Sequence, residues 1–294
     1  MKYFFYWGCS LDGGSGANFK VSIESICRYL GIEIVEIDDW NCCGASISYA
    51  GANDLEVKIL NARNFALAEA KGSYDIIAPC SSCYIQMNKF NHEYNGDEVV
   101  NSNINEILSE GGLKYTGRLR VRHIQDLLFN DVGINKIKEK VKKPLHGLKV
   151  AGYVGCQTVR PYGEYDSVEK PAVQDYILEA LGAEAVLFPK KINCCGSGIF
   201  LPEMDLCLPL VKDILDDAIN NGAELISTVC PMCAMNLEMY QGKINEKYNT
   251  KYDIPVVYLT QLIAIAFGMD LKKDAALNYN FIPPEGILLN AIGH

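Results

Sequence analysis

The segment ICRYLGIEIVEIDDWNCCG at residues 26–44 is matched later in the chain by ILEALGAEAVLFPKKINCCG at residues 177–196. Each segment begins with the end of an apolar, helix-like pattern that stops at Leu-Gly, at 30–31 and 181–182. A glycine after the last apolar position is typical of a helix C-terminus. A short β-like run then leads to Cys-Cys-Gly. The chain therefore contains the same helix–strand–cysteine unit twice.

The repeat extends to both sides of this unit. Tyr-Trp-Gly-Cys at 6–9 matches Tyr-Val-Gly-Cys at 153–156, and DIIAPCSSC (75–83) matches ELISTVCPMC (224–233). Equivalent cysteines lie 147 to 152 residues apart, which indicates a tandem duplication. Because the charged stretch NKIKEKVKKPLHG (135–147) precedes the second copy, we expect a first cysteine-rich domain at 1–145 and a second at 146–294.

Strand and helix patterns alternate in both halves, which predicts an α/β fold of two tandem Rossmann-like domains with parallel sheets. The predicted strands cover 2–8, 32–37 and 74–79 in the first half and 149–155, 183–188 and 223–229 in the second, and strand-to-helix segments follow at 121–128 and 255–263. The predicted helices cover 19–30, 54–71, 172–181 and 206–221. Every cysteine group follows a strand, so the cysteine-bearing loops should converge at the carboxyl ends of the strands.

Composition excludes several classes of protein. The 294 residues are 49% hydrophobic and 21% charged, which is a globular composition rather than a disordered one. The net charge of −9 makes nucleic acid an unsuitable partner. The N-terminus lacks a signal-peptide pattern, and the most apolar stretch, 256–271, is too polar to span a membrane. We therefore expect a cytoplasmic protein.

Ten of the twelve cysteines form two sets of five, each with a single cysteine, an adjacent pair and a Cys-x-x-Cys pair. Cys-x-x-Cys is the usual spacing for two thiolates on one metal or cluster. Zinc or a cubane cluster takes four thiolates, so either one cysteine per set is spare or the cluster is of another kind. Structural zinc stays open, as does a thiol–disulfide relay, although neither pair is predicted to open a helix after the aromatic residue usual in redox motifs. Cys27 and Cys207, outside the pattern, are predicted core residues.

The pattern Cys-x(31–38)-Cys-Cys-Gly-x(33–36)-Cys-x-x-Cys, present twice, resembles the cysteine-rich CCG domain. The whole chain is similar to the B subunits of archaeal heterodisulfide reductases, especially in PKKINCCGSG (189–198) and TVCPMCAMNLEMYQ (228–241). This resemblance implies reduction of the mixed disulfide of coenzyme M and coenzyme B, with the S–S bond cleaved between two noncubane [4Fe–4S] clusters. It implies Cys9, Cys42, Cys43, Cys80 and Cys83 as ligands of one cluster, and Cys156, Cys194, Cys195, Cys230 and Cys233 as ligands of the other.

Further residues are candidates for roles beside the clusters. His123 is a candidate proton donor because imidazole titrates near neutral pH. The substrate implied by the resemblance carries a sulfonate, a carboxylate and a phosphate, which call for cations. The candidate cations are Arg160, Lys190, Lys191, Lys212 and Arg122. The glycines at 11–18 lack phosphate-loop spacing, and we expect them to provide a flexible approach to a cluster or substrate.

The chain lacks flavin, nicotinamide and ferredoxin fingerprints, so electrons must come from other subunits. The resemblance implies an iron–sulfur C subunit, a flavin-containing A subunit, and a hydrogenase or formate dehydrogenase module. The apolar tail at 281–294 either docks such a partner or caps the core. The alternative function is electron transfer in a membrane-associated or organic-acid oxidoreductase whose chemistry lies on a partner. A zinc-stabilised scaffold is a third possibility.

Overall fold

Two four-stranded parallel sheets form the framework of the computed structural model, which describes residues 1–200 and 202–293. The first sheet has the order β2-β1-β3-β4 and the second the order β6-β5-β7-β8. The strands of the first are β1 (Lys2–Phe5), β2 (Glu33–Glu36), β3 (Asp75–Ile77) and β4 (Arg120–Arg122). Those of the second are β5 (Lys149–Tyr153), β6 (Glu184–Ala185), β7 (Leu225–Thr228) and β8 (Val256–Tyr258). The prediction of a duplicated parallel α/β fold is confirmed.

In both halves at least one helix connects each strand to the next, and the first half has an extra short helix after each of its first two strands. The helices of the first half are α1 (Gly8–Leu11), α2 (Ala17–Leu30), α3 (Ala45–Tyr49), α4 (Asp54–Ala70), α5 (Ser81–Gly96), α6 (Glu98–Glu110), α7 (Ile124–Asp126) and α8 (Ile134–Lys140), with a π-helical turn at Leu127–Val132. Those of the second are α9 (Val173–Ala180), α10 (Met204–Asn220), α11 (Pro231–Met239), α12 (Gln241–Tyr248), α13 (Leu259–Ala266) and α14 (Glu285–Ala291). Short 3₁₀ turns lie at Pro189–Ile192 and Leu277–Tyr279. The four helices predicted from the sequence are present, within two residues at each end.

One sequence prediction needs correction. Both Cys-x-x-Cys pairs do open helices, since Cys80 is the residue before α5 and Cys230 the residue before α11. The charged stretch at 135–147, which marked the expected boundary, holds most of α8, and α8 packs on α9 of the second half. The sequence did not indicate α8 because its residues are mostly charged and exposed, and only Ile137 of this helix is buried.

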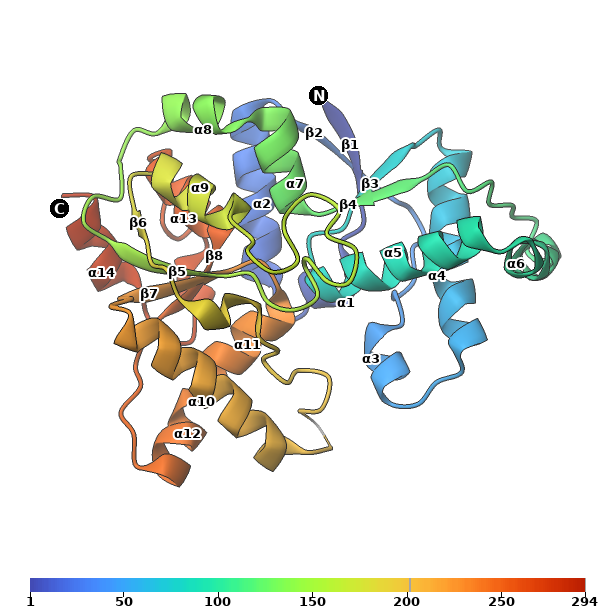
Figure 1. Ribbon diagram of the computed structural model, residues 1–294. Coiled ribbons are helices and arrows are strands. Elements are labelled where there is room, and N and C mark those ends of the chain that lie inside the picture. Colours follow the sequence, from blue (N-terminus) through green and yellow to red (C-terminus); the bar gives the residue numbers. More distant parts are fainter. Residues whose placement is uncertain (201, 294) are drawn as a thin grey trace.

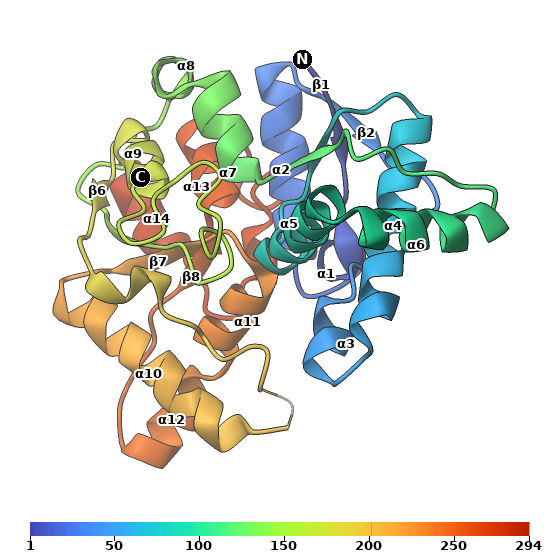
Figure 2. The same cartoon turned by 45° about the vertical axis from the view of Figure 1, so that its right-hand side comes forward.

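The two halves pack closely on each other, side by side in both views of the ribbon (Figures 1 and 2). Helix α2 packs along α13, where the hydroxyl oxygens of Ser22 and Thr260 lie 2.6 Å apart. The rings of Phe19 and Tyr258 stack with centroids 4.3 Å apart. One continuous apolar core runs through both halves. The division at residue 145 stays a prediction.

The C-terminal tail is partly built into the second half. Leu288 of α14 is fully buried, and the Glu238 carboxylate accepts backbone N–H groups of Phe281 and Ile282, each at 3.1 Å. The Phe281 side chain itself is 65% exposed. The tail therefore caps part of the core, and its docking role stays a prediction. Among the residues described, none of the helices combines the length and apolarity that crossing a bilayer requires.

Candidate metal centre

The strands bring all ten repeated cysteines to one region. Cys9 lies in α1 directly after β1, and the adjacent pair Cys42-Cys43 follows β2. Cys83 lies in the first turn of α5, after β3. The second half repeats this arrangement after β5, β6 and β7. Parallel strands end at the same edge of a sheet, so the sequence order alone gathers these thiols.

In the first set, the thiols lie in close pairs. The sulfurs of Cys9 and Cys42 are 3.9 Å apart, and those of Cys43 and Cys83 are 3.3 Å apart. Gly8 has φ +68°, and a Cβ atom placed on it would lie 2.9 Å from the Cys83 sulfur. A side chain at Gly8 would therefore both strain the backbone and enter the thiol site.

The second set has the same pairing. Cys156 is hydrogen-bonded to Cys194, and the sulfurs of Cys195 and Cys233 lie 3.5 Å apart. Gly155 has φ +75°, and a Cβ atom placed on it would lie 3.4 Å from the Cys233 sulfur. The Gly196 N–H donates to the Cys194 sulfur at 3.3 Å, as the corresponding glycine of the first half does to Cys42 at 3.5 Å. The two sites therefore share one construction.

The two sets meet at a pair of buried thiols. Cys80 of the first half and Cys230 of the second lie close enough for their thiols to influence each other, and the interaction with Cys230 raises the pKa of Cys80. The pKa of Cys230 is lowered by hydrogen bonds with Cys233 first and Cys80 second. The side chains next to this pair also join the halves, because Ser81 pairs with Thr158 at 2.7 Å. The two five-cysteine sets are thus neighbours.

Crowding shifts the titration of the thiols in opposite directions within a pair. The hydrogen bond from Cys156 lowers the pKa of Cys194 to about 6, whereas the pKa of Cys156 is raised. In the first set, hydrogen bonding with Cys42 followed by burial raises the pKa of Cys9. Without a cation beside them, only some of the thiols can therefore ionise. A bound metal ion would offset the repulsion between neighbouring thiolates and allow the others to ionise.

A tyrosine supports each adjacent cysteine pair. Tyr6 donates its hydroxyl to the Asn41 carbonyl at 2.9 Å, and Tyr153 donates to the Asn193 carbonyl at 2.6 Å. Burial, and after it the nearby thiols, raises the pKa of both phenols, so both remain donors. Sequence reasoning missed this role, although both tyrosines stand in the repeated Tyr-x-Gly-Cys motif.

A cavity of about 330 Å³ opens on the second set. It is lined by Ser81 of the first half and, from the second, by Val154, Gly155, Cys156, Gln157, Thr158, Cys194, Cys195, Gly196, Ser197, Gly198, Ile199, Leu210, Cys230 and Cys233. All five cysteines of the second set therefore face one hollow. Among the described residues, its lining has no carboxylate, imidazole or amine.

The donor set suits an iron–sulfur cluster. The five cysteines of the second set line one cavity whose described lining has no carboxylate or imidazole, those of the first set lie in close pairs, and thiolates are the ligands of such clusters. Within 1–200 and 202–293, no three or more Cys, His, Asp or Glu side chains gather as the site of a metal ion. The thiols instead lie in pairs, in the second half around a hollow, which fits a group larger than one ion.

His123 lies close to the junction of the two sets but is completely buried. Its ring follows β4, and Nδ1 accepts the Gln125 N–H at 3.3 Å. Burial lowers its pKa to about 4, against the opposing influence of Cys230 and of the backbone at Pro79 and Val229. The imidazole is therefore neutral at pH 7, and its role as a proton donor stays a prediction.

The structure does not bring the five candidate cations into the cavity. Lys190 pairs with Asp213, Lys191 with Asp175, and Lys212 with Asp216. Arg122 is buried among three carboxylates, and the exposed Arg160 donates to the backbone oxygen of Val168. Their role in substrate binding stays a prediction, and for the four that pair with carboxylates an anionic substrate would have to displace an existing partner.

The glycine-rich segment of the first half reaches the second half. A Cβ atom on Gly16 would lie 3.0 Å from the side chain of Pro231, which follows Cys230. A Cβ on Gly14 would lie 2.7 Å from the Cys9 carbonyl oxygen. These glycines allow a close approach of backbone to the cysteine junction, and the proposed flexibility of the segment stays a prediction.

Comparison with known proteins places these features in context. The family model described as "Cysteine-rich domain" (CCG) matches residues 3–88 and 150–238. The chain is 34% identical to the 8-methylmenaquinol:fumarate reductase membrane anchor subunit of Wolinella succinogenes, covering 96% of this chain and 97% of that protein. It is 32% identical to a protein of Archaeoglobus profundus described as similar to the B subunit of heterodisulfide reductase, covering 94% of each. It is 30% identical to the B subunit of a CoB-CoM heterodisulfide reductase of Methanosarcina acetivorans, covering 86% of this chain and 87% of that protein.

A solved structure shares the fold. A hypothetical protein from Helicobacter pylori superposes with a TM-score of 0.75 at 15% sequence identity. The match covers 96% of this chain and 52% of the other, so the chain spans about half of that protein. At this identity the likeness concerns the fold alone.

Proposed function

Because the chain belongs to the CCG cysteine-rich domain family, we propose that it is the iron–sulfur subunit of a disulfide-reducing complex. Its substrate in this proposal is the mixed disulfide of coenzyme M and coenzyme B, cleaved between two noncubane [4Fe–4S] clusters. The observation that carries the proposal is the contact between Cys80 and Cys230, which makes the two five-cysteine sets neighbours. Two adjacent one-electron groups suit a reaction that consumes two electrons.

The proposed ligands are the ten repeated cysteines, five in each half. Cys9, Cys42, Cys43, Cys80 and Cys83 would hold one cluster, and Cys156, Cys194, Cys195, Cys230 and Cys233 the other. When bound, each cluster would supply one of the two electrons that cleavage of an S–S bond requires. In this proposal the fifth cysteine of each half is a cluster ligand. In a zinc site with four ligands it would be spare.

The chain's own residues shape access to the second set. Val154, Ile199 and Leu210 supply an apolar part of the cavity lining, whereas the side chains of Gln157 and Thr158 in the same lining are already hydrogen-bonded to Ser82 and Ser81 of the first half. Protons are also required, because each released thiolate takes one. His123 is the proposed donor, since its ring lies beside the backbone that precedes both Cys-x-x-Cys pairs, and because the imidazole is neutral at pH 7 it must take up a proton before it gives one.

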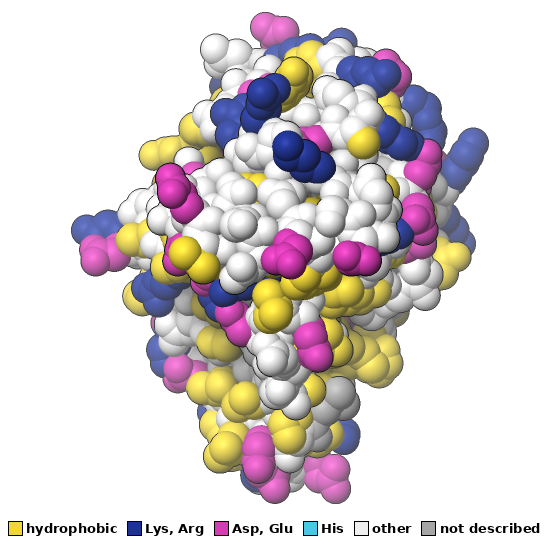
Figure 3. All heavy atoms as spheres, turned by 90° about the vertical axis from the view of Figure 1, so that its right-hand side faces the viewer, with side chains coloured by type: hydrophobic (Ala, Val, Ile, Leu, Met, Phe, Trp, Pro, Cys, Tyr) yellow, Lys and Arg dark blue, Asp and Glu magenta, His cyan; other side chains and the backbone are white. Residues whose placement is uncertain are grey.

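Electrons must arrive from a partner, and the surface offers places for one to dock. Ile47 and Leu55 follow the first Cys-Cys-Gly and are exposed, as are Ile199 and Leu206 after the second. On the face shown in Figure 3, apolar side chains gather over the lower half, whereas Lys and Arg gather towards the top. We propose that an iron–sulfur C subunit docks near the cysteine loops and receives electrons from a flavin-containing A subunit, which a hydrogenase or formate dehydrogenase supplies.

One observation favours a second candidate function, electron transfer to a partner that does the chemistry. A substrate with a sulfonate, a carboxylate and a phosphate needs cations, and the described lining of the cavity has none. Four of the candidate cations are already paired with carboxylates. The similarity to a fumarate reductase membrane anchor subunit supports the same alternative, in a quinol- or organic-acid-linked complex.

Metal content is the first test. Protein purified without oxygen should contain about eight irons per chain with matching sulfide. About four irons with one zinc would leave one redox half, and paired cleavage of a disulfide would fail. Iron-free protein with zinc alone would support a scaffold instead.

Activity then separates the two functions. Holoprotein supplied with reduced viologen should release two thiols from each mixed disulfide of coenzyme M and coenzyme B. Fully loaded protein that accepts electrons from viologen yet releases no thiol would overturn the disulfide reductase and support electron transfer. Cystine serves as the control disulfide. Thiol release from cystine as well would contradict the proposed specificity for the disulfide of the two coenzymes.

A further inference from the structure

Each Cys-Cys-Gly turn rests on a long helix, but on different side chains in the two halves. A Cβ atom on Gly44 would lie 3.1 Å from Val57 of α4, and one on Gly196 would lie 2.9 Å from the Cys207 sulfur of α10. The next contacts match, because both glycines also approach a leucine, Leu60 or Leu210. Val57 and Cys207 therefore occupy equivalent places beneath the turn.

An asparagine amide holds the backbone of each turn. Asn61 donates to the Cys43 carbonyl at 2.9 Å, and Asn236 donates to the Cys195 carbonyl at 3.0 Å. Both side chains are fully buried, yet Asn61 comes from α4 and Asn236 from α11. The carbonyl of the second cysteine in each turn thus accepts a hydrogen bond from an asparagine amide, but the two asparagines lie on helices that do not correspond.

The second half adds one more donor. The Cys207 thiol donates to the Cys195 carbonyl at 3.4 Å, and the Asn236 amide also donates to the Cys207 sulfur at 3.4 Å. Cys207 is completely buried. The prediction that Cys207 is a core residue is confirmed, but its thiol also contacts the backbone of a cysteine of the second set. Val57 cannot supply the corresponding bond in the first half.

We propose that Cys207, together with Asn236, is a positioning residue that gives the second iron–sulfur site a higher reduction potential than the first. The inference rests on the proposed function, in that both cysteine sets hold iron–sulfur clusters. Hydrogen bonds and charge around a cluster are established levers on its potential. A second donor on the Cys195 carbonyl withdraws negative charge beside the site, so adding an electron there costs less.

The consequence is a direction for electrons within the chain. The second set lines the cavity, and an electron shared between the two sites would rest preferentially beside that cavity. A duplicated protein whose halves were identical would have no such preference. The difference in donor number between the two turns comes from Cys207 in place of Val57.

The test replaces Cys207 with the residue of the matched position. In anoxic holoprotein, the midpoint potentials of the two clusters are measured by redox titration followed by electron paramagnetic resonance. C207V should lower the potential of one cluster by at least about 30 mV, a threefold change in its one-electron equilibrium. The other cluster should be unchanged. C27V is the control, because Cys27 is also buried but lies in α2.

The outcomes separate the inference from the proposed function. Wild-type protein without iron would overturn both. Wild-type protein with two clusters, and unchanged potentials in C207V, would overturn the inference alone. If C207V loses iron, C207S, which keeps a donor, should restore both the iron content and the higher potential. Iron loss in both variants would mean that Cys207 serves only to pack the core, and it would overturn the proposed effect of Cys207 on the reduction potential.

Discussion

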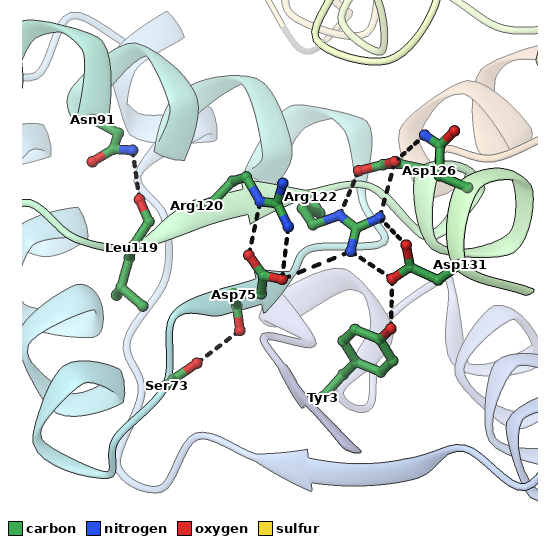
Figure 4. Close-up of polar contacts among 10 residues, drawn as sticks. Tyr3, Ser73, Asp75, Asn91, Leu119, Arg120, Arg122, Asp126 and Asp131 are labelled. Carbon is green, nitrogen blue, oxygen red and sulfur yellow. Dashed lines mark hydrogen bonds and ion pairs between the residues drawn. The ribbon is translucent and has the colours of Figure 1, made fainter. Parts of the chain in front are cut away.

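Arg122 provides a sharp test of the assignment of charged residues, because the sequence made it a candidate substrate ligand and the structure surrounds it with carboxylates. Its guanidinium donates to Asp126 at 2.6 and 3.0 Å and to Asp131 at 2.6 and 3.1 Å (Figure 4). Asp75 lies 3.7 Å away, and Tyr3 donates to Asp131 at 2.5 Å. We predict that Arg122→Met lowers stability and leaves substrate affinity unchanged in protein that remains folded.

The magnitude follows from burial. The Arg122 side chain is 6% exposed, while the Asp126 and Asp131 side chains are 14% and 25% exposed. Removing one partner from a buried ionic network costs about 3–5 kcal/mol. Because water reaches the carboxylates in part, we take about 3 kcal/mol, the lower end of that range. At roughly 2–4 °C per kcal/mol for a chain of this size class, the melting temperature should fall by about 6–12 °C.

The assay is thermal unfolding of equally loaded protein, followed by circular dichroism without oxygen. Arg120→Met is the matched control, because Arg120 stands on the same strand but its side chain is 67% exposed. An exposed pair contributes at most about 1 kcal/mol, so the control should melt within about 4 °C of wild type. A melting temperature of Arg122→Met equal to that of the control would refute the structural role.

The pH dependence of this variant has a definite sign. Although burial opposes it, hydrogen bonds from Arg122 and Tyr3 hold the pKa of Asp131 below its usual value. A depressed carboxyl pKa stabilises the fold above the unfolded pKa of about 4, and this stability is lost as pH falls through the folded pKa. The difference between wild type and Arg122→Met should therefore shrink in acid.

Three further predictions concern other parts of the molecule. Cys43→Ser and Cys195→Ser should each lose about half of the iron and all disulfide reduction while remaining soluble, whereas Cys27→Ala keeps both; full activity in both serine variants would contradict paired clusters. Burial raises the pKa of Glu238 from 4.5 to about 6, so its contribution to stability is present below pH 4.5 and lost as pH rises through 6. The urea-unfolding free energies of wild type and Glu238→Gln should thus diverge by about 2 kcal/mol between pH 4.5 and 7, and a constant difference would sink this assignment. Ser22→Ala should lower the free energy of unfolding by about 1–3 kcal/mol, because the buried Thr260 hydroxyl loses its partner. The double variant Ser22→Ala/Thr260→Val should recover part of this loss, whereas strictly additive losses would show that the two hydroxyls are not coupled.

The fold was predictable because its signals are local and occur twice. The short apolar runs that precede the cysteine groups correctly predicted β1, β3, β5 and β7, and the Leu-Gly pairs correctly predicted the ends of α2 and α9. Helices α5 and α11 were missed because polar residues, such as Ser81 and Ser82 in α5 and Asn236 in α11, are buried beside the apolar ones, which removes the amphipathic pattern. Pro231 at the first position of α11 was a usable signal, because proline favours that position.

The gathering of the ten cysteines was predictable for the same reason, whereas their polar surroundings were not. Cysteine spacing and strand order suffice to gather thiols at the ends of parallel strands. Whether a lysine is free depends on carboxylates distant in sequence: Lys191 meets Asp175, and Lys190 meets Asp213. Asn61 and Asn236 likewise support equivalent carbonyls from non-equivalent helices, so the repeat pattern could not reveal them.

The arrangement of the halves gives the duplication a functional consequence. Helix α2 of the first half packs on α13 of the second, and Gln125 of α7 donates to Gln174 of α9 at 3.1 Å. Helix α8, from the first half, also covers α9. Each half therefore uses the other to bury a helix that follows its own first strand. Because these contacts hold the two sheets together beside their cysteine-bearing ends, the spacing between the two cysteine sets is set by the fold and not by a flexible linker. If both sets hold iron–sulfur clusters as proposed, a change at this interface, such as Ser22→Ala/Thr260→Val, should alter the magnetic coupling between them, measured by electron paramagnetic resonance, even where the ligands are intact.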